Sequence, residues 1–575
     1  MKRLSIFILC SVLAVNLCYV VWLRRNIYLQ TFDLTTSTNP QEVKMIKSTN
    51  VHVESKTSHR RKIERRLSAD TENHHTIIYS RLNEVISETG ALLHQPCQDK
   101  NTAANARLST LALLDSPDTV YEIGDKIHVL ATLFDSSGER KWTGGDHLRS
   151  RIWNNIFSAP GSIYDYKNGS YLLIFTAFWS GKSQISATIA YTREAITAFY
   201  RMPYEVLSLR TIKAKFKVQN YEEVTLCHPN MKHLLAHTKH KYACNFTSLN
   251  SGMPWYCGKP KNPNLKCSDW KFVKSSLPKL PLTISKCEKE LLYFRSHQMF
   301  SKTITVTVKE RMYYNGRKDV EHIIPSIPCS KYNTTKLWER KTTTGFFYNM
   351  RWQLTHCQGF ESDNFQECLR NKKLYLIGDS TTRQWYKHFL DQYNCTQYTE
   401  IWTSKTWKRL SGCTVKNNNF TVIMAPHCQP FNYVNGWTPR NYTQISISKH
   451  LESIPSNEDA IVVIHLFLHM RGYHHDCFRN KMQAIRASTQ KLIETNKKVK
   501  MFIKLPHTFT QNFQGYDDFF GYVFTDIIFK TFHGLYDRII VLDNKDATNA
   551  IASVPMHPHN FVVESMVDQM LSYLC

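Results

Sequence analysis

The sequence predicts four successive folded or membrane-inserting regions: an N-terminal apolar segment, a β-sandwich, a cysteine-rich region and a C-terminal α/β domain. Three observations support this prediction. The chain has 575 residues, which is too long for one core and suits two to four domains. Hydrophobic residues make up 42% and aromatic residues 12%, enough apolar surface for folded cores. Along the chain, short β-rich segments give way to alternating strands and helices.

The first element is an uncharged apolar run from Leu4 to Leu23, with basic pairs at residues 2–3 and 24–25. A run of this length can span a bilayer as a helix. It ends in bulky residues rather than in a small-residue cleavage site, which favours an uncleaved signal anchor over residues 1–25. A cleaved signal peptide, followed by secretion, is the alternative.

Residues 26–85 are polar and rich in Ser, Thr, Asn and His, which predicts a stem without a core of its own. The basic cluster at residues 59–66 is expected to be a solvated run of charge. A processing site or a contact for anionic glycans is the alternative for this cluster.

Cysteines and glycosylation sequons indicate the compartment. Of sixteen cysteines, fourteen follow the apolar run, an even number that suits pairing in an oxidising lumen. Six Asn-x-Ser/Thr sequons, which are glycosylated only in the secretory pathway, lie at Asn168, Asn245, Asn333, Asn394, Asn419 and Asn441. Since all of them are downstream of the apolar run, we expect a Golgi or cell-surface type II membrane protein, or a secreted one. In that compartment the net charge of +26 favours anionic glycans and lipid headgroups as partners, not nucleic acid.

Residues 86–220 contain short β-rich runs, at 126–133, 170–178 and 184–191, separated by Gly, Asp, Asn and Ser turns. Strands at this spacing predict an antiparallel β-sandwich. Three local patterns lie within it, at residues 144–149, 168–171 and 178–181, and none of them has the composition of a catalytic site.

Residues 221–345 are basic, rich in proline and contain six cysteines, without any Cys-x-x-Cys pair. This composition predicts a loop-rich region stapled by disulfides rather than a zinc site, and we expect no metal. Most of the fourteen cysteines are predicted to be paired. Cys575, five residues beyond Met570 in the expected last helix, is predicted to pin that helix and so steady the loop that bears His557.

Residues 346–575 alternate between apolar strands, at 374–378, 460–468, 499–504 and 538–543, and amphipathic helices, at 382–390, 478–496, 519–532 and 561–574. This alternation predicts a parallel sheet with helices on both faces. In such sheets the chemistry lies at the carboxyl ends of the strands.

Candidate catalytic residues lie at these strand ends. Gly378 forms a turn after the first strand and presents Ser380 at a helix N-terminus, where free N–H groups and the helix dipole can stabilise an oxyanion. A serine hydroxyl needs a base, and His557 follows the last strand. Asp546, or alternatively Asp543, is expected to orient His557 as in a Ser/His/Asp triad.

Other polar residues near these strand ends leave alternatives open. His469 either contacts an oxyanion or substrate, or is a buried histidine with its hydrogen bonds satisfied. Arg383 either binds a carboxylate, such as that of sialic acid, or pairs with a neighbouring residue. The cluster at 474–477 resembles a metal site only in composition, and Cys477 is expected to be disulfide-bonded or buried.

The sequence resembles the neurexophilin and PC-esterase domain (NXPE) family over nearly everything after the stem. Residues 144–151, 168–171 and 178–181 look like the immunoglobulin-like, neurexophilin-type domain of that family. Residues 374–385 resemble the first motif of its PC-esterase module, a relative of GDSL/SGNH acyl esterases. Asp543, Asp546 and His557-Pro558 match the terminal motif, His469 also matches the family, and the ending at 571–575 is similar to the family's C-terminus.

The resemblance implies a flavodoxin-like α/β esterase fold, a Ser/Asp/His triad and O-acylated glycans as substrates. Two departures bear on the site. SGNH enzymes generally carry Asp three residues before His, whereas Asp546 is eleven residues before His557. The family has an acidic-Asn pair after the strand that ends at Lys504, whereas this chain has Leu505-Pro506-His507.

Two functional hypotheses follow. The first is a glycan O-acyl esterase or O-acetyltransferase that needs no cofactor, apart from an acyl donor such as acetyl-CoA if it transfers. The second is a catalytically silent, neurexophilin-like binding glycoprotein whose sandwich contacts a cell-surface receptor. Hydrolysis and transfer share the same acyl-enzyme and differ only in the acceptor.

Overall fold

The computed structural model describes residues 96–575 apart from 206–210, 251, 277–283, 294–297, 311–324, 326, 340–342, 360–364, 399–409, 428–435, 441–445, 472, 474 and 511–517. The expected anchor, residues 1–25, and the stem, residues 26–85, lie outside the described residues. Within the described part of the chain, no helix combines the length and apolar character needed to cross a bilayer.

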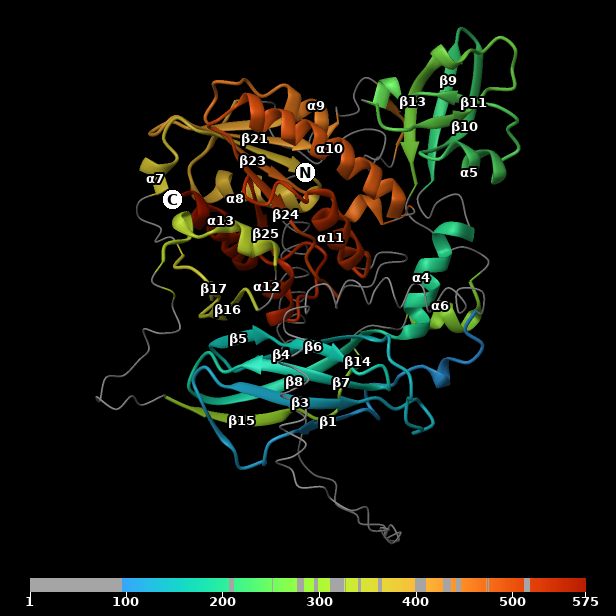
Figure 1. Cartoon of the computed structure of the whole chain (residues 1–575). Coiled ribbons are helices and arrows are strands. Elements are labelled where there is room, and N and C mark those ends of the chain that lie inside the picture. Colours follow the sequence, from blue (N-terminus) through green and yellow to red (C-terminus); the bar gives the residue numbers. More distant parts are fainter. Residues whose placement is uncertain are drawn as a thin grey trace, which may run out of the picture. The chain divides into compact units, whose positions relative to one another are not determined.

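Two sheets share one core in the N-terminal sandwich (Figure 1). The four-stranded sheet has the order β1-β3-β7-β6, with β1 (Thr110–Leu113), β3 (Lys126–Thr132), β6 (Ser162–Asp165) and β7 (Ser170–Thr176). The second sheet has the order β17-β16-β5-β4-β8-β15-β2, with β2 (Val120–Glu122), β4 (His147–Trp153), β5 (Phe157–Pro160), β8 (Gly181–Tyr191), β15 (Ile304–Lys309), β16 (Gly345–Tyr348) and β17 (Arg351–Leu354). A short strand, β14 (Gln298–Met299), also pairs with β8.

Alternating apolar residues bring these two sheets together. Val129 of β3 and Leu173 of β7 pack against Ile152 of β4 and Ile185 of β8, and all four are buried. Because side chains alternate across a strand, the residues between them on β4 and β8 lie on the outer face. Strands β14–β17 come from residues beyond 220, so a later part of the chain completes the second sheet.

A smaller sheet follows, in the order β11-β12-β10-β9-β13-β22. Its strands are β9 (Ile212–Val218), β10 (Tyr221–His228), β11 (Ala243–Asn245), β12 (Tyr256–Gly258), β13 (Trp270–Ser275) and β22 (Thr438–Pro439). Three helices accompany the two N-terminal modules: α4 (Arg193–Glu205), α5 (Met231–Ala236) and α6 (Lys286–Tyr293). Since β22 belongs to the C-terminal part of the sequence, this sheet also joins distant segments of the chain.

Disulfides staple the fold as the cysteine content predicted. The bridges are Cys97–Cys287, Cys227–Cys257, Cys244–Cys267, Cys329–Cys357, Cys368–Cys575 and Cys395–Cys413. The bridge to Cys368 confirms that Cys575 pins the last helix. Cys477 is unpaired within the described residues, and Cys428 lies outside them.

The C-terminal domain is built on a sheet with the order β19-β20-β21-β18-β23-β24-β25 (Figure 1). Five strands are parallel: β18 (Lys373–Gly378), β21 (Phe420–Pro426), β23 (Ala460–Ile464), β24 (Lys500–Lys504) and β25 (Ile539–Leu542). Two antiparallel strands, β19 (Thr396–Gln397) and β20 (Ser411–Val415), extend one edge. The predicted parallel sheet is therefore confirmed.

Helices cover both faces of this sheet, again as the alternation predicted. They are α7 (Phe365–Cys368), α8 (Ser380–Gln392), α9 (Ile447–Glu452), α10 (His475–Thr495), α11 (Phe520–Thr531), α12 (Lys545–Ala550) and α13 (Asn560–Leu574), with short 3-10 helices at Lys100–Thr102, Ser248–Asn250, Cys267–Asp269, Cys329–Lys331, Thr334–Trp338 and Leu468–Met470. In β18, Leu374 and Leu376 pack in one core with α8 and α13, while Ile377 packs in another with α10 and α11. This strand is thus buried on both sides, as parallel sheets require.

A buried ion pair connects the sandwich with the C-terminal domain. Arg149 of β4 donates to both carboxylate oxygens of Asp518, at 2.7 and 2.6 Å, and to the Phe509 carbonyl at 3.2 Å. The hydroxyl of Tyr191, at the end of β8, donates to the same carboxylate at 2.5 Å. Charge-assisted hydrogen bonds between an arginine and a carboxylate are among the stronger polar contacts in proteins, so this pair holds β4 and β8 against the segment that precedes α11.

Candidate functional site

Ser380 lies where the first parallel strand turns into a helix. It is the first residue of α8, it is half-buried, and Asp379 caps the helix by accepting from the Thr381 N–H at 2.8 Å. A Cβ added at Gly378 would meet Thr382 Oγ1 at 2.4 Å and the His465 carbonyl oxygen at 2.5 Å, so the turn has room only for glycine. As the first residue of the helix, Ser380 presents an N–H that no carbonyl of its own helix can accept.

His557 is brought to Ser380 from the other end of the domain. Its Nε2 lies 2.8 Å from Ser380 Oγ, across 177 residues of sequence. With the hydroxyl donating to Nε2, the neutral ring carries its proton on Nδ1. This contact brings together the two residues that the sequence analysis proposed as nucleophile and base.

Two hydrogen bonds hold the loop that carries His557. The side chain of Gln384, one turn after Ser380 in α8, donates from Nε2 to the Pro558 carbonyl at 2.9 Å. On the other side, His507 donates from Nε2 to the Met556 carbonyl at 2.9 Å. Burial lowers the pKa of His507 to about 3, so it stays neutral and keeps donating. The residues before and after His557 are therefore both fixed to the domain.

The protonation state of His557 suits a base. Burial lowers its pKa below the ordinary value of 6.5; the charge of Arg383 lowers it further, and the charge of Asp379 opposes the shift. At neutral pH the ring is accordingly neutral and can take a proton from Ser380.

The two aspartates expected to orient His557 make other contacts. Asp546 accepts from the N–H and the hydroxyl of Thr344, at 2.8 and 2.9 Å. Asp543 accepts from the Lys545 N–H at 3.1 Å. Three residues before His557 stands Val554, which is 55% exposed. Within the described residues, the structure brings Ser380 and His557 together but places no carboxylate in hydrogen-bond contact with His557.

A buried polar cluster adjoins Ser380. Asp379 Oδ2 accepts from the Leu468 N–H at 3.2 Å and lies 3.6 Å from Nε2 of His465. Nδ1 of His465 donates to the Lys504 carbonyl at 2.8 Å, and Lys504 Nζ lies 3.2 Å from the hydroxyl of Thr381. These groups connect the ends of β18, β23 and β24 next to Ser380.

Charges in this cluster compensate one another. Burial alone would raise the pKa of Asp379, but His465, His469 and Lys504 hold it well below its usual range. Burial lowers the pKa of Lys504 to about 8, and Asp379 opposes that shift. A carboxylate and an ammonium group thus stay charged near each other at neutral pH.

His469 and Arg383 also lie at this edge. His469, in the 3-10 helix that follows β23, has its Nδ1 2.5 Å from Nε2 of His427, the residue after β21. His469 is also one of the groups that lower the pKa of Asp379, the residue before Ser380. Arg383 is largely buried, which lowers its pKa to about 10 and leaves it a cation at neutral pH.

Several residues of this arrangement were not predicted as site residues, among them His465, Lys504, His507 and Gln384. A signal for the first three was available, because each lies at or just beyond the carboxyl end of a parallel strand. His507 was noted only as a departure from a family pattern. Gln384 lies within the motif at residues 374–385, and nothing in the sequence indicates that its partner is a carbonyl 174 residues away.

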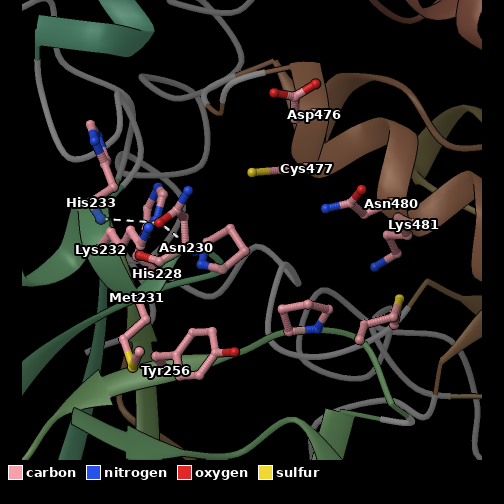
Figure 2. Close-up of a pocket in the computed structure, with 13 residues that line it drawn as sticks. His228, Asn230, Met231, Lys232, His233, Tyr256, Asp476, Cys477, Asn480 and Lys481 are labelled. Atoms are coloured by element: carbon pink, nitrogen blue, oxygen red, sulfur yellow. Dashed lines mark hydrogen bonds between the residues drawn. The ribbon is translucent and has the colours of Figure 1, made fainter.

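A separate cavity of about 510 Å³ lies between the small sheet and α10 (Figure 2). His228, Met231 and Tyr256 line one side, and Asp476 and Cys477 of α10 line the other. Burial raises the pKa of the Cys477 thiol to about 12, so it is a poor nucleophile at neutral pH. Throughout the described residues, no cluster of three or more His, Cys, Asp or Glu could hold a metal ion.

The described glycosylation sequons lie on the surface. Exposed asparagines occupy five of the six positions: Asn168, Asn245, Asn333, Asn394 and Asn419. Asn441 lies outside the described residues. Access to a glycosylating enzyme is therefore open at each of the five.

The fold and these contacts define a disulfide-stapled protein in which a β-sandwich precedes an α/β domain with a serine–histidine pair at the edge of its sheet. A family model described as NXPE family member 4-like, C-terminal domain matches residues 352–575. The neurexophilin family model matches residues 100–287. The chain belongs to the NXPE family, and the resemblance of its motifs to that family is confirmed. Disulfides and a neurexophilin-like domain are consistent with the secretory pathway or secretion.

Proposed function

We propose that this protein is an O-acyl esterase or O-acetyltransferase that acts on glycans in the secretory pathway or at the cell surface. The observation that carries the proposal is the 2.8 Å contact between Ser380 Oγ and His557 Nε2, at the N-terminus of α8. The parallel strands follow the order second, first, third, fourth and fifth. This is the order of flavodoxin-like sheets, whose ligands bind at the carboxyl ends of the strands.

The chemistry proceeds through an acyl-enzyme. His557 Nε2 takes the hydroxyl proton while Ser380 Oγ forms a bond to the acyl carbon, and the resulting oxyanion lies near the Ser380 N–H. The bond to the leaving alcohol then breaks, and that oxygen takes the proton from His557. In hydrolysis, water gives a proton to His557 and attacks the acyl carbon. The bond to Ser380 Oγ then breaks, His557 returns the proton to that oxygen, and the acid leaves. In transfer, a glycan hydroxyl takes the place of water.

Three lines of support favour acylated glycans as the substrate class. Exposed sequons and paired cysteines suit a compartment rich in glycans. The net charge of +26 favours anionic partners. Membership of the NXPE family, together with the resemblance of residues 374–385 to an acyl-esterase motif, is consistent with acyl chemistry. Hydrolysis needs no cofactor, whereas transfer needs an acyl donor such as acetyl-CoA. The proposal assigns no role to Asp543 or Asp546, whose carboxylates accept hydrogen bonds from Thr344 and from the Lys545 N–H.

The test measures release of acetate from acetylated sialosides, and transfer of acetyl to their unacetylated forms, by purified full-length protein. We expect activity in the wild type and nearly none in Ser380→Ala and His557→Ala. His559→Ala is the matched control, because His559 is exposed and only two residues from His557. Wild-type protein that matches Ser380→Ala on all donors and acceptors would contradict the proposal.

A neurexophilin-like binding glycoprotein is the second candidate. The observation in its favour is that no carboxylate contacts His557 within the described residues, and that Val554 stands where SGNH enzymes generally carry Asp. In that case the sandwich would provide the binding surface for a receptor, and the α/β domain would be structural. Full inactivity, combined with receptor binding by the wild type, would favour this candidate.

A further inference from the structure

A cavity of about 390 Å³ lies between the sandwich and the C-terminal domain. Its sandwich side is the outer face of β4 and β8, and its other side is formed by residues 508–510 and 548–554. Cavities of this size hold small molecules or single sugar units. The ion pair between Arg149 and Asp518 fixes the two sides against each other.

Two arginines on this face of β4 differ in their contacts. Arg149 is committed to Asp518 and to the Phe509 carbonyl. Arg151, two residues along the same face, packs its guanidinium over the ring of Trp153 at 4.9 Å. Within the described residues, no carboxylate pairs with Arg151, although it lines the cavity and is partly buried. A cation held in this way can accept an anionic ligand.

Several hydroxyl groups line the same cavity as this arginine. On β8, Ser186 lies directly opposite Arg151, and Thr188 lies opposite Arg149. Neither hydroxyl has a hydrogen-bond partner within the described residues, and both line the cavity. Ser553, on the facing segment, is 3% exposed and its hydroxyl is also without a partner. An arginine with several unsatisfied hydroxyls suits a ligand that carries one carboxylate and several hydroxyls, which is an acidic sugar.

The cavity shares its walls with the loop of His557. Val554 lines it and lies three residues before His557. Thr508 lines it and directly follows His507, whose side chain holds the Met556 carbonyl. The backbone of Thr510 donates to the Val554 carbonyl at 3.1 Å, so these two walls are bonded to each other. A ligand in the cavity therefore touches the two segments that position the proposed base.

We propose that this cavity binds a carboxylate-bearing sugar of the glycan substrate, and that Arg151 pairs with its carboxylate. The sandwich then serves as the substrate-recognition part of the enzyme. This inference rests on the proposed function, because it assigns the ligand as substrate. The carboxylate can come from a sialic acid or from a uronic acid, and the binding test separates these sources.

The test uses full-length Ser380→Ala protein, which binds a glycan without consuming it, and measures dissociation constants by calorimetry. The probes are sialyllactose, a glucuronate-terminated disaccharide, the methyl ester of sialyllactose and lactose. We expect one of the two acidic probes to bind, and the neutral probes to bind at least tenfold more weakly. Adding Arg151→Gln should raise the dissociation constant of the acidic probe by roughly tenfold or more. This is the loss of affinity expected when a hydrogen-bonded charge pair is removed.

Two further variants complete the design. Arg151→Lys keeps the charge but lacks the planar guanidinium. It should therefore bind the acidic probe more tightly than Arg151→Gln does, and less tightly than the protein with Arg151. Lys182→Gln removes an exposed cation from the same face of β8, outside the cavity, and should leave affinity unchanged. Equal binding of acid and methyl ester, or equal affinity with and without Arg151, would overturn the inference. If the acidic probe binds as expected but the wild-type protein neither releases nor transfers acetyl, the proposed function is contradicted and the inference about the cavity is not.

Discussion

The polar contacts around Ser380 differ from those of the two aspartates that were expected to orient His557. On the side of Ser380, Asp379 caps the helix through the Thr381 N–H and lies 3.6 Å from His465, which in turn donates to the Lys504 carbonyl. The two aspartates make hydrogen bonds elsewhere: Asp546 accepts from Thr344, and Asp543 accepts from the backbone N–H of Lys545. The difference teaches that Ser380 and His557 are held together through backbone contacts of the histidine loop, without a hydrogen bond from a carboxylate to the imidazole.

The largest effect is expected at the pair itself. Ser380→Ala and His557→Ala should each reduce acyl transfer or release by roughly 10²–10⁴-fold, the usual contribution of a positioned base. The double variant should lose little more than either single one, because the two residues act as a unit. Rates of acetyl release by the three variants, with melting temperatures as a folding control, provide the measurement. Additive losses would show that the two residues do not work together.

The next largest effect is expected at Gly378, where the turn before Ser380 is closely packed. Gly378→Ala would place a Cβ 2.5 Å from the His465 carbonyl oxygen. We expect a loss of stability of about 1–3 kcal/mol, as for other overpacked sites, together with a fall in activity. Thermal unfolding of Gly378→Ala beside Gly436→Ala, where a Cβ would meet nothing within 4 Å, checks this. Equal melting temperatures would mean that the turn is looser than described.

A smaller effect is expected for substitution of Asp546. Asp546→Asn should leave acetyl release within about threefold of wild type, since its carboxylate accepts from Thr344 instead of His557. The same change should cost stability of about 1 kcal/mol, the usual contribution of a hydrogen bond. Steady-state kinetics and thermal unfolding measure the two. A loss as large as that of His557→Ala would restore Asp546 to the orienting role.

The smallest expected effect is a shift in pH dependence. The base must be neutral, so kcat/KM should rise with pH through the pKa of His557, which burial and Arg383 place below 6.5. Arg383→Gln removes a nearby positive charge, so it should raise that pKa and move the acidic limb of the profile to higher pH. A pH–rate profile of both proteins is the measurement. A shift to lower pH would exclude Arg383 as the neighbouring charge.

Local patterns predicted much of this arrangement. The strand before Gly378, the helix that begins at Ser380 and the place of His557 after the last strand all follow from periodicity and from the rule that parallel strands end at one edge. The contacts of Asp546 did not follow, because Thr344 is 202 residues away in sequence and outside the predicted domain of residues 346–575. The participation of β15 and β16 in the sandwich likewise depends on pairing between distant segments, which periodicity does not encode.

Covalent labelling tests the central claim most directly. Full-length protein is treated with a serine-reactive fluorophosphonate, and the modified peptide is identified by mass spectrometry. An activated Ser380 should be labelled in wild type and in Asp546→Asn, and labelling should be lost in His557→Ala and Ser380→Ala. Wild-type protein that stays unlabelled at Ser380, or that is labelled equally well in His557→Ala, would contradict a working serine–histidine pair.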